Sequence, residues 1–136
     1  MKCNFKNNKG NTLVLVCAAL PMLIGVIGLC IDGSLMVYYQ TRLMAATKFA
    51  AVSASSHNKI VQEKTIINAT EDQVRSALIE NFSQAKLISF TINPASKNKC
   101  TVIAETEVNF VFMKMFLTDS KDYKKTIRES YDVTRK

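Results

Sequence analysis

The side chains that could take part in chemistry are few and scattered along the sequence. The single histidine, His57, lies in a polar stretch, and alone it lacks the partners that catalysis needs, so we interpret it as an exposed linker residue. Glu105 and Glu107 are two residues apart on a predicted strand and share a face, which favours two exposed acids over an acid–base pair. Asp32, with Gly33 and Ser34, superficially resembles a metal loop but lacks further oxygen ligands at regular spacing. We therefore expect Asp32 to lie on a helix surface.

Recognised catalytic and cofactor motifs are also missing from the sequence. It contains no Cys-x-x-Cys, His-Glu-x-x-His or Gly-x-Ser-x-Gly, and its 4 glycines all precede residue 34. The formal net charge is +7, but beyond the N-terminal lysines the charges are scattered, and they form no basic stripe for nucleic acid. We predict a protein that is not an enzyme, with no cofactor, metal, small-molecule substrate or nucleic-acid partner.

The 4 cysteines do not suggest a disulfide framework. Cys3 precedes a long apolar run, Cys17 and Cys30 lie within it, and only Cys100 belongs to the polar part of the chain. We interpret Cys100 as a small buried strand residue, with a bond to another subunit as the alternative.

The most informative segment is the uncharged apolar run at residues 13–31. Roughly 20 apolar residues in a helix cross the hydrocarbon core of a bilayer. Lys2, Lys6 and Lys9 precede the run and Asp32 follows it, so the positive-inside rule places residues 1–12 in the cytoplasm and the remainder across the membrane. A cleaved secretory signal is the alternative, but no small-x-small site follows closely.

Helical periodicity continues beyond the apolar run through residues 32–56. One apolar face recurs at spacings of three and four: Leu35, Tyr39, Leu43, Ala46, Ala50 and Ala54. With Thr12 as N-cap, one helix of roughly 65 Å is predicted from about 12 to 55. Pro21 should kink its membrane part, and Gly25 and Gly28 offer small surfaces for packing against other transmembrane helices.

Residues 57–136 are predicted to form a small head. Thr70 and Gln73 make a capping box that begins a helix reaching about Ser83. A hairpin follows, with Ile88, Phe90 and Ile92 on one face of its first strand.

The second strand of this hairpin is predicted over residues 100–112, and a third strand lies near the C-terminus. One face of the second strand carries Val102, Ala104, Thr106, Val108, Phe110 and Phe112, and the third strand carries Tyr123, Ile127, Tyr131 and Val133. Residues 110–117 are too short to span a membrane and fit a buried turn of helix or a strand end. The predicted fold is α+β, with a long N-terminal transmembrane helix, a short helix and an antiparallel sheet of about three strands.

The order of motifs in the N-terminal third resembles the TadE/TadG-like family of the Flp (tight adherence) pilus machinery. The resemblance rests on Lys9-Gly10-Asn11, Ala19-Leu20-Pro21, Gly28-Leu29-Cys30-Ile31-Asp32 and Leu43-Met44-Ala45-Ala46-Thr47, followed by an Ala/Ser-rich helix. The segment Phe112-Met113-Lys114-Met115-Phe116 is similar to one in the shorter family members. The family implies a pilin-like fold, a bacterial inner-membrane location with a periplasmic head, and partners among pilin-like subunits or assembly proteins.

The resemblance also implies a processing site of the prepilin type. The only glycine before the apolar run is Gly10, so cleavage would leave Asn11 at the new N-terminus. Classical pilins place glutamate five residues after the cut, whereas this sequence has Leu15. We therefore expect the N-terminus to stay uncut.

These observations favour a minor pilin-like subunit or assembly factor without enzymatic activity. A membrane-tethered binding or sensor module in the periplasm is the alternative, although only about 12 residues precede the membrane run and leave no room for a cytoplasmic output. A membrane-bound enzyme is disfavoured because the catalytic groups are missing.

Overall fold

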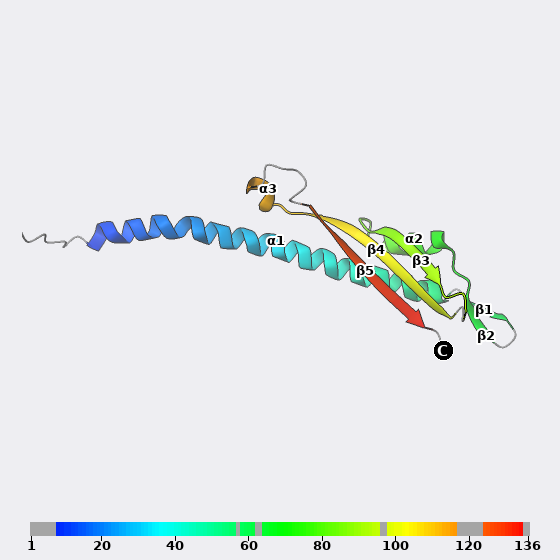
Figure 1. Ribbon diagram of the computed structural model, residues 1–136. Coiled ribbons are helices and arrows are strands. Elements are labelled where there is room, and N and C mark those ends of the chain that lie inside the picture. Colours follow the sequence, from blue (N-terminus) through cyan, green and yellow to red (C-terminus); the bar gives the residue numbers. More distant parts are fainter. Residues whose placement is uncertain (1–7, 57, 62–63, 96–97, 117–123, 135–136) are drawn as a thin grey trace, which may run out of the picture.

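The computed structural model describes residues 8–56, 58–61, 64–95, 98–116 and 124–134, and shows one long helix with a small head packed along its C-terminal half (Figure 1). The elements in chain order are α1 (Asn8–Ser56), β1 (Asn58–Val61), β2 (Lys64–Ile67), α2 (Glu71–Asn81), β3 (Lys86–Ile92), β4 (Lys99–Asn109), α3 (Met113–Phe116) and β5 (Lys124–Thr134). Strands β3, β4 and β5 form an antiparallel sheet in that order, and β1 and β2 form a separate antiparallel pair. This confirms the coarse α+β layout.

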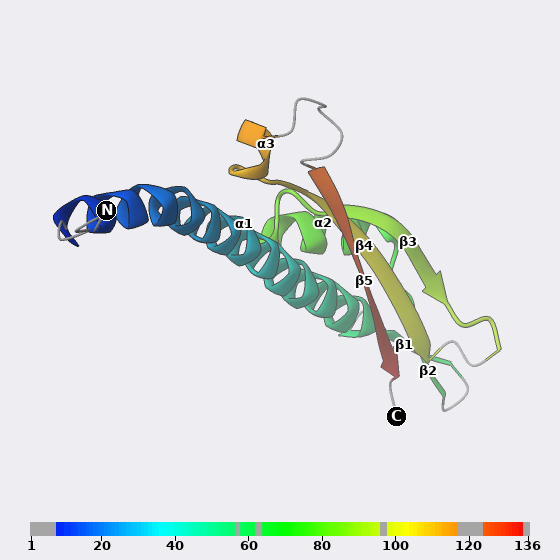
Figure 2. The same ribbon diagram turned by 60° about the vertical axis from the view of Figure 1, so that its left-hand side comes forward.

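Helix α1 is 49 residues long and contains Pro21. It begins at Asn8, four residues before the expected N-cap at Thr12. Its N-terminal half projects beyond the head in both ribbon views (Figures 1 and 2). Only 6% of its most apolar 18-residue window is buried, so this half is not a core helix of the head. By length and composition α1 can cross a membrane.

The core lies between the C-terminal half of α1, helix α2 and the sheet. The predicted apolar face of α1 is confirmed from Leu43 onward, with Leu43 and Ala50 fully buried and Ala46 and Ala54 nearly so. Tyr39 is half-buried against this core, and Met36 packs there in place of the predicted Leu35, which is half-buried. Alanines on α1 let the backbone of the sheet approach closely, which suits a thin core in so small a head.

Helix α2 begins where the capping box predicts. Thr70 adopts an extended conformation (φ −93°, ψ 155°), and its N–H donates to Oε1 of Gln73 at 3.1 Å. Val74 and Leu78 bury the inner face of α2, and Phe82 caps its C-terminus by donating its N–H to the Leu78 carbonyl at 2.9 Å. The ring of Phe82 meets that of Tyr39 edge to face at 5.9 Å, which joins the end of α2 to α1.

The hairpin of β3 and β4 is confirmed, but the predicted face of β3 is wrong at Ile88. The register shifts between Leu87 and Ser89, as in a β-bulge. Because a bulge adds one residue, it reverses which side chains point inward. Leu87, Phe90 and Ile92 therefore pack against the core, whereas Ile88 is 44% exposed.

Strand β4 alternates as predicted, with Val102, Ala104, Thr106 and Val108 buried, but it ends at Asn109. The expected extension to Phe112 is wrong because the chain leaves the sheet at residue 110 and forms α3, a single helical turn.

The helical turn predicted within residues 110–117 is present, but its burial was overestimated. Val111 is 61% exposed and Met115 is 79% exposed. On β5, Ile127 is buried and Tyr131 and Val133 are half-buried, as expected for its inner face. Cys3, His57 and Tyr123 lie outside the described residues.

Candidate functional site: the joint between helix and head

The structural feature that distinguishes this chain is a contact between the end of the apolar run and the segment after β4. Gly28 and Asp32 are four residues apart on α1, so they lie one turn apart on the same face of the helix. Val111, Phe112 and Met113 pack onto that face from the head. We call these five residues the joint.

The Asp32 carboxylate holds the joint through three backbone hydrogen bonds. The N–H groups of Val111 and Phe112 donate to its Oδ1 at 2.9 and 3.0 Å, and the N–H of Met113 donates to its Oδ2 at 2.8 Å. Only 4% of the residue is exposed, so the expected surface position of Asp32 is wrong. Burial disfavours a carboxylate charge, but three converging N–H donors stabilise the ionised form and satisfy donors that the turn would otherwise leave unpaired.

Gly28 completes the joint by having no side chain. A Cβ built on Gly28 would overlap the ring of Phe112, so only glycine allows the ring to lie this close to the helix backbone. We expected Gly28 to pack against other transmembrane helices, but the Phe112 ring of the same chain occupies that surface. Gly25 has nothing within 4 Å of its Cβ position, so Pro21 and Gly25 are the positions left for packing between helices.

The joint is built for positioning rather than catalysis. Three backbone N–H groups occupy three of the roughly four lone-pair sites of the Asp32 carboxylate, which leaves little capacity for a general base or a metal ligand. Among the residues that the structure describes, no group of three or more His, Cys, Asp or Glu side chains could hold a metal ion.

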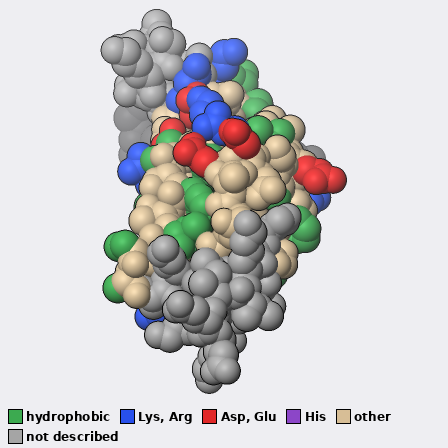
Figure 3. Space-filling model, turned by 90° about the vertical axis from the view of Figure 1, so that its right-hand side faces the viewer, with side chains coloured by type: hydrophobic (Ala, Val, Ile, Leu, Met, Phe, Trp, Pro, Cys, Tyr) green, Lys and Arg blue, Asp and Glu red, His purple; other side chains and the backbone are tan. Residues whose placement is uncertain are grey.

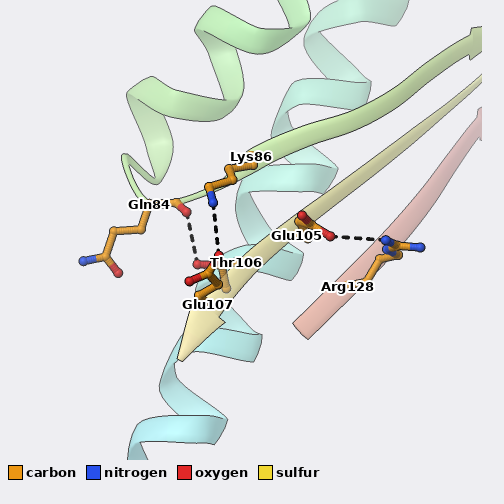
Figure 4. A network of polar contacts seen from close by, with 6 residues as sticks. All are labelled: Gln84, Lys86, Glu105, Thr106, Glu107 and Arg128. Atoms are coloured by element: carbon orange, nitrogen blue, oxygen red, sulfur yellow. Dashed lines mark hydrogen bonds and ion pairs between the residues drawn. The ribbon is translucent and has the colours of Figure 1, made fainter. Parts of the chain in front are cut away.

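The second candidate pair, Glu105 and Glu107, lies on the outer face of the sheet (Figure 4). Glu107 pairs with Lys86 of β3 and Glu105 with Arg128 of β5, each at 3.2 Å. Each carboxylate therefore faces a cation on a different neighbouring strand. These solvent-accessible pairs contribute at most about 1 kcal/mol each. Between them, the buried Thr106 hydroxyl donates to the Gln84 carbonyl at 3.1 Å and ties the segment before β3 to β4.

Charges on the end of the head farthest from the N-terminus are mixed in sign. Asp and Glu side chains lie next to Lys and Arg side chains among the described residues of this face (Figure 3). Such interspersed charges suit a solvated surface better than a nucleic-acid-binding one.

Cys100 is a core residue with an unreactive thiol. It is 1% exposed, and its S–H points at the Ala51 carbonyl with 3.8 Å between sulfur and oxygen. Burial raises the pKa of the Cys100 thiol, and the negative charge of Asp132 raises that pKa further. The thiolate that would react is disfavoured on both counts.

We therefore predict that Cys100 resists alkylation in the folded head. In a chain whose other cysteines are replaced by serine, a maleimide should react at pH 7.5 roughly a hundredfold more slowly than in denaturant. Ser130→Cys, on the exposed side of β5, supplies the matched accessible thiol when Cys100 is also replaced. Equal rates for the two thiols would show that Cys100 is accessible and available for a bond to another subunit.

Comparisons with known proteins return no match: no protein-family model, no curated protein and no solved structure is significantly similar to this chain. The site is therefore interpreted from its own geometry.

Sequence reasoning found both halves of the joint but did not connect them. The segments Gly28–Asp32 and Phe112–Phe116 each stood out, yet Gly28 was assigned to packing between helices and Asp32 to the helix surface. A signal was present, because glycine and aspartate four residues apart place a gap and an acceptor on one helix face. Which segment fills that face depends on the tertiary fold.

Proposed function

We propose that this protein is a non-enzymatic, pilin-like subunit or assembly factor of a Flp/Tad-type pilus, anchored in the bacterial inner membrane with its head in the periplasm. The observation that carries the proposal is the unpartnered outer face of α1. Beyond the apolar run, on the side away from the head, Val37, Met44 and Val52 are 64%, 50% and 49% exposed.

These side chains lie along one stripe of the helix. Successive members are seven and eight residues apart, so at 3.6 residues per turn they stay within about 80° of one another. Tyr38 and Phe49, 52% and 51% exposed, border the same stripe. An apolar helical stripe in water favours burial against another helix.

The stripe continues toward the apolar run. Val37 shares an open apolar groove on α1 with Cys30 and Ser34, and Val26 continues the same face into the apolar run. A partner helix of similar length could therefore contact α1 both in lipid, near Val26, and in the periplasm, near Met44. Parallel packing of long, half-embedded helices is what a pilin-like role requires.

Crosslinking in the native membrane tests this function. A photoreactive residue at Val37 or Met44 of the full-length chain, expressed in its own host, should form adducts with Flp/Tad pilin-like subunits or assembly proteins that mass spectrometry identifies. The same group at Ile88, exposed on β3, is the matched control and should give few adducts. If the two α1 positions crosslink no more than Ile88, or only to proteins outside the pilus machinery, the proposal is wrong and a tethered periplasmic binding module is favoured.

A further inference from the structure

The joint carries an exposed apolar segment that the contacts within the chain leave uncovered. Met115 has the highest exposure of any large hydrophobic residue in the described part of the chain, 79%, and Val111 is 61% exposed. Both flank Phe112 and Met113, which are held against α1. The buried half of the segment thus fixes where the exposed half lies.

The contact with Gly28 sets the depth of this segment relative to the apolar run. Gly28 is three residues before Ile31, which is about 4.5 Å along the helix. The run at residues 13–31 is about 28 Å long, close to the roughly 30 Å of a hydrocarbon core, and the part before Gly28 alone would span only about 22 Å. Gly28 must therefore lie close to the outer boundary of the hydrocarbon, and α3, which directly follows the Phe112 that covers Gly28, contacts α1.

The polar groups of the joint are suited to this position. A charge or an unpaired N–H at the edge of a bilayer is costly, and here the Asp32 carboxylate, in a residue only 4% exposed, and three N–H groups satisfy one another. Val111 and Met115, directed away from the joint, are apolar side chains that lipid accepts, and the exposed Lys114 between them can extend its ammonium group to the headgroups.

We propose that Val111 and Met115 insert into the outer interface of the same bilayer that α1 crosses, so that the head is attached to the membrane at a second point. The inference rests on the transmembrane placement of α1 and on no pilus partner. A second attachment restricts how the head tilts and rotates about α1. As a result, the Val37–Met44–Val52 stripe, on the opposite side of α1, faces sideways along the membrane surface, toward neighbouring proteins.

Tryptophan fluorescence can locate this segment because the natural chain contains no tryptophan. The full-length Met115→Trp variant, reconstituted into phosphatidylcholine vesicles with lipids brominated high on the acyl chain, should emit at shorter wavelength than in denaturant and lose about half or more of its intensity to the bromines. Val111→Trp should behave alike. Ile88→Trp, at an exposed position of β3 remote from the joint, should emit as in water and keep its intensity.

Flotation of the vesicles separates the two ways in which the proposal can fail. If the protein floats with the lipid but neither Met115→Trp nor Val111→Trp is quenched beyond Ile88→Trp, the head does not insert and the proposal is wrong, although the anchor stands. If the protein does not float, the anchor and the proposal fail together.

Discussion

Replacing Asp32 with alanine is expected to release the head segment from α1 and to lower the free energy of unfolding by about 3 kcal/mol. The substitution removes the acceptor of three N–H bonds, from Val111, Phe112 and Met113, in a part-buried contact. A difference of this size shifts the opening equilibrium by roughly a hundredfold. Trypsin cleavage after Lys114 in detergent, followed by mass spectrometry, reads this opening directly because Lys114 lies in α3.

Two further variants test whether the acceptor oxygens of the Asp32 carboxylate, rather than the size of its side chain, hold the joint. Asp32→Asn keeps one carbonyl oxygen as an acceptor, but its amide N–H groups replace the other oxygen and face backbone N–H donors. Its cleavage rate should therefore lie between those of the wild type and Asp32→Ala. Asp132→Ala removes a carboxylate from the exposed side of β5 and should change stability by less than about 0.5 kcal/mol. Cleavage of Asp32→Ala at the wild-type rate would mean that the three hydrogen bonds do not hold the joint.

Gly28→Leu is expected to displace the ring of Phe112 and to destabilise the joint by about 1–3 kcal/mol. The reason is steric, since even a methyl group at position 28 would overlap the ring. Gly25→Leu is the matched control because its Cβ position has nothing within 4 Å. The same cleavage after Lys114 should accelerate in Gly28→Leu and stay at the wild-type rate in Gly25→Leu.

A double-mutant cycle isolates the contact itself. Phe112→Ala removes the ring and weakens the joint, but it also makes room for a side chain at position 28. The combined Gly28→Leu and Phe112→Ala variant should therefore lose less stability than the sum of the two single losses, by about 1 kcal/mol. Strict additivity would show that the two residues do not compete for the same space.

The joint lies where α1 changes from apolar to amphipathic. There the Asp32 carboxylate and the Phe112 ring hold the head against the helix, so the position of the head is tied to the apolar half of α1. If that half crosses a membrane as proposed, the joint sets how the Val37–Met44–Val52 stripe is oriented relative to the bilayer.

Several elements could be read directly from local sequence. The capping box at Thr70 and Gln73 was found correctly because its hydrogen bond spans only three residues. The alternation along β4 was correct because the strand is paired on both edges and packs with one face on α1, which makes a period of two visible. The burial of Leu43 and Ala50 followed from helical spacing in the same way.

The errors arose where a distant contact decides the outcome. A strict period of two predicts that Ile88 points into the core, but the bulge reverses the alternation of β3. No residue type near Ile88 predicts that extra residue. Val111 and Met115 looked like core because their segment is apolar, whereas they face outward beside α1. The absence of processing between Gly10 and Asn11, in the first turn of α1, stays a prediction.

Local sequence specifies the long apolar helix, its amphipathic continuation, the short capped helix and the hairpin, because each depends on hydrogen bonds and periodicities within a few residues. The roles of Gly28 and Asp32 depend instead on the tertiary fold, because their partners lie about 80 residues further along the chain. The roles of the gap at Gly28 and of the buried charge of Asp32 depend on the segment that packs against them, and the tertiary fold places that segment there.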